Sequence, residues 1–483
     1  METIRDRRRY DFREGEFDRG QPVTLRFEGH DLRAFSKESV AVALLANNVR
    51  VASRSLKYHR PRGAFCLSGR CMSCLARVDG VPNVRTCHVR CRDGMTVVRE
   101  NSLPGASTDL LRTFDFAFPS HMNYHEMFTK PRWVNQALQT AVQQFAGTGD
   151  LPTDIAETPP ISRHEVDVLV IGGGPAGIAA ALEAAAGGAK VWLVEDAPEL
   201  GGHLVGWPNA VDDRETGAAW IAENRTRLAE AGVEVTTDAE CIGFFHEGFW
   251  GIHRQGASIL AEAQRTIVAT GAYDQPALFA GNDLPGIFSA RGMLKLVHRW
   301  GVRAAESVAI IGTNDTALAL AETLPEAGIQ VVGLIEAGDA IRGDGDRAEL
   351  VQSRGVPVFL NTKPTAAIGL KRLRGLKTEN SDGAAVRARC DAVCVATTPA
   401  PSWELAAQAG AEAEYDPERG GFVARADSCG RTSQEHVLIT GEMLGAASPD
   451  EVIRRGRIAG ITAVLDLQRT DALQARLDAL LGS

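Results

Sequence analysis

Four cysteines near the N-terminus have the residue type and spacing to bind a metal cluster. They are Cys66, Cys71, Cys74 and Cys87, in the order C-x4-C-x2-C…C. This order is the plant-type spacing for a two-iron, two-sulfur cluster, in which each iron takes two thiolates. Wrapping such a cluster requires sharp bends, so we expect Gly63 and Gly69 to supply backbone freedom in the loop. The pattern predicts a 2Fe-2S cluster and therefore a carrier of single electrons.

Other ligand arrangements around these cysteines fit the sequence less well. Zinc sites typically use paired C-x2-C knuckles, and only Cys71 and Cys74 form one. Rieske-type ligation would need histidine in place of two cysteines, so neither His59 nor His88 is expected to be a ligand. Cys91 is predicted to be a spare buried thiol. The alternative that it substitutes for one of the four ligands stays open.

A glycine-rich loop further along the chain predicts a second redox cofactor. An apolar strand, the loop, a helix and a second strand follow one another in VDVLVIGGGPAGIAAALEAAAGGAKVWLVEDA, residues 166–197. In this dinucleotide fingerprint Gly172 makes the tight turn, Gly174 lets the backbone approach a pyrophosphate and Gly177 lets helix and strand pack closely. Pro175 and Ala176 complete the loop. Glu195, followed by Asp196, ends the second strand where an acid would hold ribose hydroxyls.

Three later segments supply further cofactor-binding residues, and the last two of them favour FAD over NAD. ELGGHL (199–204) supplies Gly201, Gly202 and His203 for a second close pass along an extended cofactor. TIVATGAYDQP (266–276) ends a strand at Thr270 and Gly271, and VLITGEM (437–443) ends one at Gly441 and Glu442. The last two resemble the ATG and GD motifs of flavoproteins with two dinucleotide-binding domains, in which the C-terminal segment returns to cover the flavin. Glu442 departs from the usual Asp, which leaves its hydrogen bond to the ribityl chain open.

A second, degraded nucleotide fold is predicted in SVAIIGTNDTALALAETLPEAGIQVVGLIE, residues 307–336. Where the fingerprint has three glycines, this segment has Gly312, Asn314 and Ala317. A Cβ at Asn314 obstructs close approach of a phosphate. We expect the fold to persist and leave NAD(P)H binding open. Glu336 would favour NAD over NADP by repelling a 2′-phosphate.

The elements around these motifs indicate an α/β protein of several domains. Residues 23–29 alternate like a strand, 37–48 have helical spacing and 74–84 contain a strand and a turn, which suits a β-grasp ferredoxin-like module. Residues from about 105 to 160 show no clear period and are expected to form a connector packed over a partner domain. From Asp167 onward apolar strands alternate with Ala-rich helices. The predicted fold class is a glutathione-reductase-like flavoprotein with two dinucleotide-binding domains and an N-terminal β-grasp 2Fe-2S domain.

The predicted boundaries divide the 483 residues into five segments. They are the 2Fe-2S domain (1–105), the connector (106–165), the first part of the FAD domain (166–290), the degenerate NAD(P)-like domain (291–400) and the second part of the FAD domain with a C-terminal helix (401–483).

Composition and charge narrow the function classes. The chain has a net charge of −9, whereas residues 1–104 carry 20 Lys and Arg against 12 Asp and Glu. The basic segment suits either an electronegative cluster or a docking face. Nucleic-acid binding is not expected, given the overall acidity and the lack of aromatics among the basic residues. No uncharged apolar stretch of about 18 residues occurs, and the N-terminus lacks a signal-peptide core, so we expect a cytoplasmic protein with no transmembrane segment.

No catalytic residues are predicted in this chain. Disulfide-reductase chemistry is disfavoured because no C-x2-C pair lies near the flavin segments. Cys390 and Cys394 are expected to be buried thiols. Arg454 and Arg455 are expected to lie on a solvated helix face.

Several segments resemble the alpha subunit of heteromeric sarcosine oxidase. They are SLKYHRPRG (55–63), PNVRT (82–86), NYHEMFTKPRW (123–133) and the flavin domain. The chain is also similar to the large subunits of opine oxidases, hydrogen cyanide synthase and proline or hydroxyproline dehydrogenases. Unlike sarcosine oxidase alpha subunits, it has the cluster cysteines and does not continue into a folate-binding domain, so folate-coupled demethylation is not expected. Opine-oxidase-like subunits often end in a second cysteine-rich region, which this sequence lacks.

The resemblance implies the electron-transfer subunit of a heteromeric amine dehydrogenase or oxidase. A beta subunit of the D-amino-acid-oxidase type would take hydride from a secondary amine or imino acid, and this chain would pass the electrons through FAD and the cluster to a downstream acceptor. Small additional subunits, an FMN at the partner interface and a bound NAD or other adenine nucleotide stay open. Two alternatives remain: a self-contained NADH-dependent reductase, and a scaffolding subunit with vestigial cofactors.

Overall fold

A computed structural model describes residues 4–8, 17–55, 59–100, 130–145, 160–245, 248–254 and 256–482. The chain forms two compact units, each assembled from two separate stretches. Unit 1 comprises Met1–Ile155 and Pro276–Ala396, and unit 2 comprises Ala156–Gln275 and Thr397–Ser483. Most of the expected connector, including its packing over a partner domain, lies outside the described residues. Its described residues include a helix that was not predicted, α3 (Arg132–Phe145), and residues 160–165, most of which belong to strand β8 (Ile161–Ile171).

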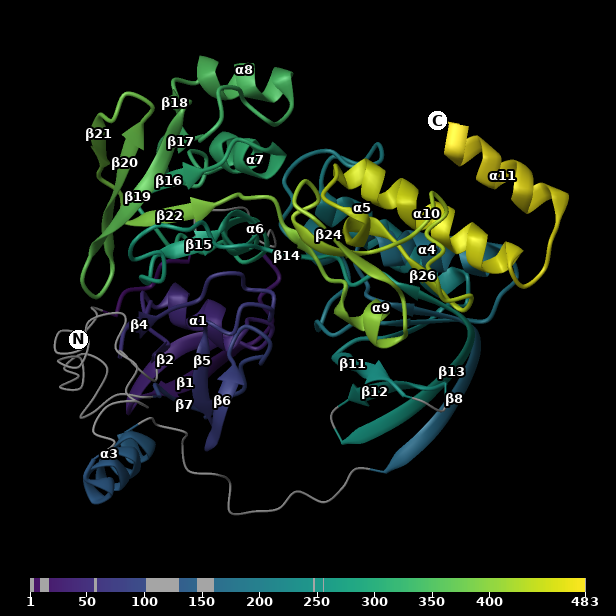
Figure 1. Cartoon of the computed structure of the whole chain (residues 1–483), viewed down its shortest axis with the longest axis horizontal. Coiled ribbons are helices and arrows are strands. Elements are labelled where there is room, and N and C mark those ends of the chain that lie inside the picture. Colours follow the sequence, from purple (N-terminus) through teal and green to yellow (C-terminus); the bar gives the residue numbers. More distant parts are fainter. Residues whose placement is uncertain are drawn as a thin grey trace. The chain divides into compact units, whose positions relative to one another are not determined.

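The N-terminal part of unit 1 is a β-grasp module (purple in Figure 1). Its mixed sheet has the order β2-β1-β7-β5-β6, with β1 parallel to β7 and the other neighbours antiparallel. Ser39 caps α1, and every residue of that helix is buried. Apolar residues from α1 and from the inner face of the sheet form the core. The elements are β1 (Pro22–Phe27), β2 (His30–Phe35), α1 (Val40–Ala46), β5 (Leu75–Val78), β6 (Val81–Arg85) and β7 (Thr96–Val98), with the ribbon β3 (Ser53–Arg54) and β4 (Pro61–Arg62).

The rest of unit 1 is the predicted second nucleotide-like fold. Its parallel sheet has the order β15-β22-β16-β17-β18, and the antiparallel sheet β19-β20-β21 leads into β22. Helix α6 continues directly into a π-helical segment, Lys295–Arg299. The elements are β15 (Ile287–Ser289), α6 (Ala290–Leu294), β16 (Ser307–Ile311), α7 (Asp315–Thr323), β17 (Gln330–Ile335), α8 (Gly345–Ser353), β18 (Val358–Phe359), β19 (Thr362–Gly369), β20 (Leu373–Asn380), β21 (Ala385–Ala388) and β22 (Ala392–Val395).

Unit 2 repeats this plan around the glycine-rich fingerprint. Its main sheet has the order β10-β9-β8-β13-β12-β11; β13 is parallel to β8 and β26 but antiparallel to β12. The elements up to the first chain crossing are β8 (Ile161–Ile171), α4 (Pro175–Ala186), β9 (Val191–Val194), a 3-10 turn (Gly202–Leu204), α5 (Gly217–Glu230), β10 (Glu234–Thr236), β11 (Ala239–Phe244), β12 (Trp250–Arg254), β13 (Ala257–Val268) and β14 (Ala272–Tyr273).

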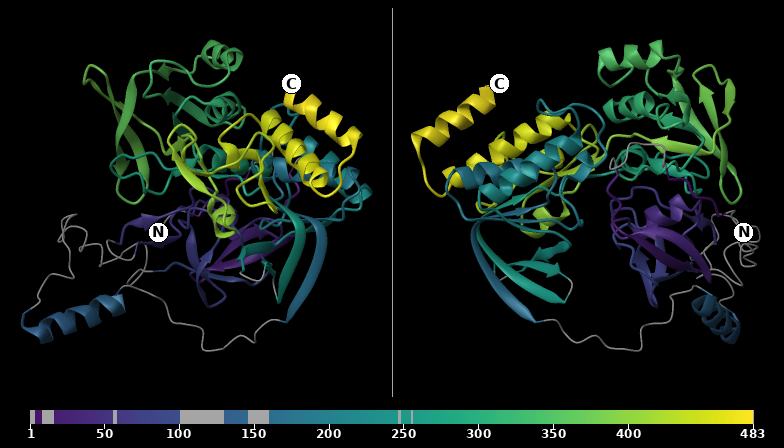
Figure 2. Two further views of the ribbon diagram at one scale, coloured as in Figure 1. Left: turned by 45° about the vertical axis from the view of Figure 1, so that its right-hand side comes forward. Right: turned by 180° about the vertical axis from the view of Figure 1, so that it is seen from behind.

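The chain returns to unit 2 to complete this sheet and cover it. The returning elements are β23 (Ala400–Pro401), α9 (Glu404–Gln408), β24 (Ala413–Asp416), β25 (Gly421–Ala424), β26 (Val437–Ile439), a 3-10 turn (Gly441–Leu444), α10 (Pro449–Leu465) and α11 (Asp471–Gly482). Helix α10 lies along α4, as the two views of Figure 2 show, and both helices contribute to one apolar core. Among the described residues, no helix has the length and apolar character to cross a membrane.

Candidate functional site

The four predicted cluster ligands lie together in the loop that precedes β5 and in the segment after β6. Cys66 and Cys74 are buried, whereas Cys71 and Cys87 are half-buried. Left-handed backbone at Leu67, Gly69 and Met72 bends the loop, with φ values of 54°, 77° and 52°. The backbone N–H of Ser68 points to the Cys66 sulfur, 3.4 Å away. Donors of this kind stabilise a thiolate and tune the potential of a bound cluster.

The four thiols contact one another in two pairs. Cys71 donates a hydrogen bond to Cys66, which lowers the pKa of Cys66 and raises that of Cys71. Cys87 donates to Cys74, with the same opposite effects on the two pKa values. Across the described part of the chain, no three His, Cys, Asp or Glu side chains converge as they would around a single ion. Two pairs of thiols fit the demand of a dinuclear cluster, which takes two thiolates per iron.

The residues near this loop either bend its backbone or pack closely against neighbouring atoms. Gly69 has the predicted bend, but Gly63 does not have a left-handed conformation. A Cβ at Gly63 would lie 2.5 Å from the Arg50 carbonyl oxygen, so this glycine permits close packing instead, and our expectation for it was wrong. Cys91 lies in the core of the β-grasp sheet, where burial raises the pKa of its thiol. His88 packs against Gly69, since a Cβ there would lie 1.9 Å from the His88 Nε2.

In unit 2 the fingerprint residues form an open cradle at the N-terminus of α4. Gly172 has a φ of 109°, and a Cβ on it would lie 2.4 Å from the Ala269 carbonyl oxygen. Gly177 packs on the Gly172 carbonyl oxygen, 1.8 Å from its hypothetical Cβ. A Cβ at Gly174 would meet only the Gly202 Cα, at 4.0 Å. The space beside the first turn of α4 can therefore admit a phosphate group, as a dinucleotide requires.

The carboxyl group of Glu195 is buried beneath this cradle. Its Oε1 accepts a hydrogen bond from the Ala197 N–H (2.8 Å), and its Oε2 accepts one from the Gly173 N–H. Burial, followed by the charge of Asp196, raises the pKa of Glu195 to about 8. The carboxyl therefore sits at the end of β9, where the sequence predicted a ribose-binding acid.

Two of the other predicted segments, residues 199–204 and 437–443, lie against the N-terminus of α4. The Gly201 N–H donates to the Gly173 carbonyl oxygen (2.8 Å). His203 Nδ1 lies 2.7 Å from Glu442 Oε2, so two predicted site residues that are far apart in the sequence pair directly. A Cβ on Gly441 would lie 2.7 Å from the Ala176 Cβ. The turn after β26 thus lies against the first turn of α4.

Thr270 and Gly271 reach the same region from the end of β13. The Thr270 hydroxyl lies 3.2 Å from the Ser402 carbonyl oxygen and 3.3 Å from the Met443 sulfur. The Gly271 carbonyl oxygen accepts from the Ser402 N–H (2.9 Å). Unit 2 therefore brings together all the residues predicted to hold the flavin.

Two residues of α10 that were not predicted to belong to the site, Arg455 and Gly456, support this cradle. Arg455 donates to the carbonyl oxygens of Gly441 (3.1 Å) and Gly445 (2.8 Å). The expectation of a solvated helix face was wrong for Arg455, whereas the side chain of its neighbour Arg454 is 34% exposed and donates to the Leu480 carbonyl oxygen at 2.6 Å. Gly456 packs on Ala176, with its hypothetical Cβ 2.3 Å from the Ala176 carbonyl oxygen. The G-x3-G spacing of Gly456 and Gly460 is a sequence signal for such close helix packing.

The second nucleotide-like fold repeats part of this arrangement. Gly312 makes the same tight turn, with a φ of 102°, and Glu336 accepts from the Gly338 N–H (2.9 Å) and the Thr313 hydroxyl (2.8 Å). Asn314 differs from its counterpart Gly174. Its side chain accepts from the Ala317 N–H (3.1 Å) and donates to the Ala396 carbonyl oxygen (2.8 Å). The first turn of α7 is thus capped by the protein itself, and NAD(P)H binding there stays untested.

Comparison with known proteins supports both halves of this description. A family profile for a "2Fe-2S iron-sulfur cluster binding domain" matches residues 20–102, and one for "Pyridine nucleotide-disulphide oxidoreductase" matches residues 166–462. The alpha subunit of sarcosine oxidase from Rhizobium meliloti (strain 1021) is 30% identical over 441 residues, which cover 85% of this chain and 43% of that protein. An opine oxidase subunit from Agrobacterium tumefaciens (strain Ach5) is 25% identical over 345 residues, which cover 62% of this chain and 66% of that protein.

A solved structure shares the fold over most of the chain. L-proline dehydrogenase from P. horikoshii matches with a TM-score of 0.67 and 22% identity, covering 96% of this chain and 78% of that chain. The present chain spans less than half the length of the sarcosine oxidase subunit that it matches. Together these findings confirm the predicted resemblance, the fold class, the oxidoreductase assignment and the cofactors FAD and 2Fe-2S.

Proposed function

The chain belongs to the pyridine nucleotide-disulphide oxidoreductase family, and from that premise we propose that it is the electron-accepting subunit of a heteromeric amine-oxidising complex. A partner subunit would oxidise a secondary amine or imino acid, such as sarcosine, an opine or proline, at its own flavin. The relatives named as subunits of sarcosine and opine oxidases support this proposal. A D-amino-acid-oxidase-type flavoprotein is the proposed partner, and the cytoplasm is the proposed location.

The observation that carries the proposal is the presence of two redox sites of different kinds in one chain. Unit 1 holds four thiols in two contacting pairs, and unit 2 holds an open cradle at a helix N-terminus. FAD, when bound, accepts electrons in pairs and releases them singly, which suits delivery to a one-electron cluster. A chain that joins these two sites can convert a two-electron oxidation into single-electron transfer.

Within this proposal each group of residues has a binding role. Cys66, Cys71, Cys74 and Cys87 would be the cluster ligands. The first turn of α4 would hold the FAD pyrophosphate, and Glu195 would hold a ribose. Gly441 and Glu442 would face the flavin from the returning segment, with His203 fixing the Glu442 carboxylate through their 2.7 Å contact. The second nucleotide-like fold would supply no hydride, because Asn314 already caps the helix end that a pyrophosphate would need.

The proposal is tested by separating amine oxidation from single-electron delivery. The complex of this chain with its amine-oxidising partner is given sarcosine or proline, with either a small two-electron dye or cytochrome c as acceptor. The wild-type complex should reduce both acceptors. A Cys71→Ala variant that keeps its FAD should still reduce the dye but should lose most of the cytochrome c activity. Unchanged cytochrome c reduction by the variant would show that electrons do not leave through the cluster.

A further inference from the structure

The loop that carries Cys66, Cys71 and Cys74, here called the cluster loop, packs directly on the second nucleotide-like fold within the same compact unit. The contact is made by the start of α6. The Ser289 N–H donates to the Phe65 carbonyl oxygen at 3.0 Å. The Ser289 hydroxyl caps α6 by accepting from the Gly292 N–H at 2.9 Å. The residue that precedes the first cluster cysteine is therefore tied to the helix by a backbone hydrogen bond.

Gly292 leaves the backbone of the cluster loop just enough room. A Cβ at this position would lie 2.8 Å from the Phe65 carbonyl oxygen and 3.1 Å from the Cys66 carbonyl oxygen. Both neighbours are backbone atoms, so they cannot turn aside as a flexible side chain could. Gly292 has no left-handed conformation, so alanine would fit its backbone but not its surroundings. Any side chain here must move Phe65 and Cys66, or α6 itself.

The loop cannot easily move away, because a second contact fixes its other side. Arg50 is almost fully buried and donates to the Asp391 carbonyl oxygen (2.6 Å) and to the Asp391 carboxylate (2.7 Å). A third bond joins Arg50 to the Ala304 carbonyl oxygen (2.8 Å). Gly63, at the start of the loop, packs between the Arg50 carbonyl oxygen and Pro285, with its hypothetical Cβ 2.5 Å and 3.3 Å from them. Breaking this ion pair on the Asp391 side is costly, since it leaves the Arg50 charge, which is 4% exposed, without its carboxylate partner.

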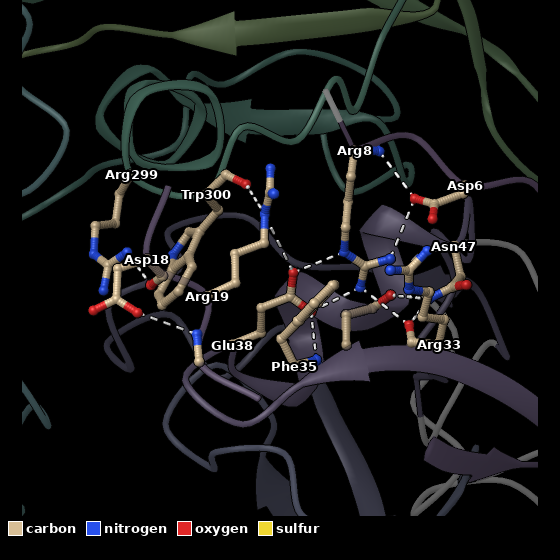
Figure 3. Close-up of polar contacts among 12 residues, drawn as sticks. Asp6, Arg8, Asp18, Arg19, Arg33, Phe35, Glu38, Asn47, Arg299 and Trp300 are labelled. Carbon is tan, nitrogen blue, oxygen red and sulfur yellow. Dashed lines mark hydrogen bonds and ion pairs between the residues drawn. The ribbon is translucent and has the colours of Figure 1, made fainter. Parts of the chain in front are cut away.

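The C-terminal end of the helix that begins with α6 contacts residues near the N-terminus of the β-grasp module. Figure 3 shows Arg8 and Arg19 both directed at the Glu38 carboxylate. Arg8 donates to it twice, at 2.8 and 2.7 Å, and both side chains are fully buried. Arg19 in turn donates to the Trp300 carbonyl oxygen (3.0 Å), just beyond the π-helical segment. The continuous helix from Ala290 to Arg299 thus contacts the module at both of its ends.

We infer that the second nucleotide-like fold holds the β-grasp module and its cluster loop in a fixed position, and we call it the mount of the cluster module. Within it, Gly292 is the positioning residue for the Cys66 ligand. This inference rests on the proposed role of Cys66 as a cluster ligand. The mount fixes the ligand loop through backbone contacts, so it sets the geometry and shielding of the cluster rather than its composition. Hydrogen bonding and solvent exposure around the sulfurs are known determinants of a cluster's potential and stability.

The test compares two glycine-to-alanine variants of the cofactor-replete chain. Gly292→Ala places a methyl group against the cluster loop. Gly345→Ala is the matched control in the same fold, because nothing lies within 4 Å of its hypothetical Cβ and its φ is ordinary. The readouts are the EPR g values of the reduced cluster, its visible circular dichroism and the rate of iron loss to a chelator. FAD content and melting temperature report on the rest of the fold.

The inference predicts changed g values and severalfold faster iron loss in Gly292→Ala, with FAD content as in the control. Cluster spectra and iron loss that match those of Gly345→Ala would overturn it. If Gly292→Ala does not fold, Asp391→Ala takes its place, because it removes the carboxylate that Arg50 of the module binds. An altered cluster spectrum then supports the mount and an unaltered one refutes it. A Cys66→Ala variant that keeps its full iron content would instead contradict the ligand assignment, and with it the proposed function.

Discussion

Cys91 and Cys71 differ in what surrounds them, although they belong to the same short stretch of sequence. Cys91 is 1% exposed and packs in the apolar core of the β-grasp sheet, where burial raises the pKa of its thiol. Cys71 is half-buried and hydrogen-bonded to Cys66. The contact with Cys66 places Cys71 among the thiols that a cluster needs, whereas Cys91 packs among apolar side chains of the sheet. The structure therefore supports the prediction of a spare buried thiol at Cys91.

Alanine should eliminate the cluster at position 71 and leave it intact at position 91. Cys71→Ala should abolish the EPR signal of the reduced 2Fe-2S cluster and lower the iron content. Cys91→Ala should keep both and lose only about 1 kcal/mol or slightly more of unfolding free energy, because it removes one buried sulfur atom from the core. Iron analysis and EPR on the two purified variants decide the matter. Loss of the cluster in Cys91→Ala with retention in Cys71→Ala would reverse the assignment.

Glu195 makes the stability of the flavin-free protein depend on pH. Its pKa rises from 4.5 in the unfolded chain to about 8 in the folded one, because burial and the charge of Asp196 disfavour the carboxylate. The folded state then holds more protons than the unfolded state between these values. The contribution of Glu195 to the free energy of unfolding should be fully present below pH 4.5. It should be lost as the pH rises through about 8, which lowers the free energy of unfolding by up to a few kcal/mol.

Glu195→Gln provides the control for this pH effect, because glutamine has a similar shape and no ionisation. The free energy of unfolding in urea, measured between about pH 5 and 8.5, should decline more steeply with pH in the wild type than in the variant. Parallel pH dependences would show that Glu195 ionises normally in the folded protein.

At the scale of elements, the crossing of α10 over α4 supports the cofactor cradle. Gly456 and Gly460 face the carbonyl oxygens of Ala176 and Ala180, each with a hypothetical Cβ only 2.3 Å away. Alanine at either position would overpack the contact and should cost about 1–3 kcal/mol of unfolding free energy. Ala176 belongs to the first turn of α4 at the cradle, whereas Ala180 lies one turn further on.

The two α10 variants should therefore agree in stability but differ in cofactor binding. Gly456→Ala should weaken FAD binding severalfold, and Gly460→Ala should affect it much less. Melting temperature and the dissociation constant for FAD, measured on the reconstituted variants, test this difference. Equal weakening by both would indicate that the cradle responds to general loss of packing.

Most elements were predictable because local periodicity determines them. The strand at 23–29, the helix within 37–48 and the fold around Gly172 all appear near the expected positions, since alternating or helical spacing places their apolar residues on one face. The role of Arg455 was mistaken because its acceptors, the carbonyl oxygens of Gly441 and Gly445, belong to another element, the turn after β26. Helix α3 was missed inside a segment read as irregular.

At the scale of the whole molecule, the two cofactor sites draw on different parts of the chain. The predicted cluster ligands all belong to unit 1, and the predicted flavin residues all belong to unit 2. Sequence motifs revealed both sites, but they could not reveal the mounting of the cluster module. Arg50 and Asp391 are 341 positions apart, and neither lies in a recognisable motif. Pairs of this kind become visible only when the fold brings the segments together.

This division predicts that one cofactor can be removed without the other. Chelation of iron under reducing conditions should eliminate the cluster spectrum while leaving the FAD content and the melting transition of unit 2 unchanged. Flavin absorbance after gel filtration and differential scanning calorimetry provide the measurements. Release of FAD in proportion to iron loss would show that the flavin cradle depends on the cluster.

In the proposed function electrons enter this chain from an amine-oxidising partner, and anaerobic reduction of the purified, cofactor-replete chain tests this transfer most directly. NADH is added first, followed by the partner subunit with sarcosine or proline, while flavin absorbance and the EPR signal of the reduced cluster are followed. We predict no reduction by NADH and reduction of both cofactors once the partner and amine are present. Rapid stoichiometric reduction by NADH alone would contradict the account and identify the chain as a self-contained reductase.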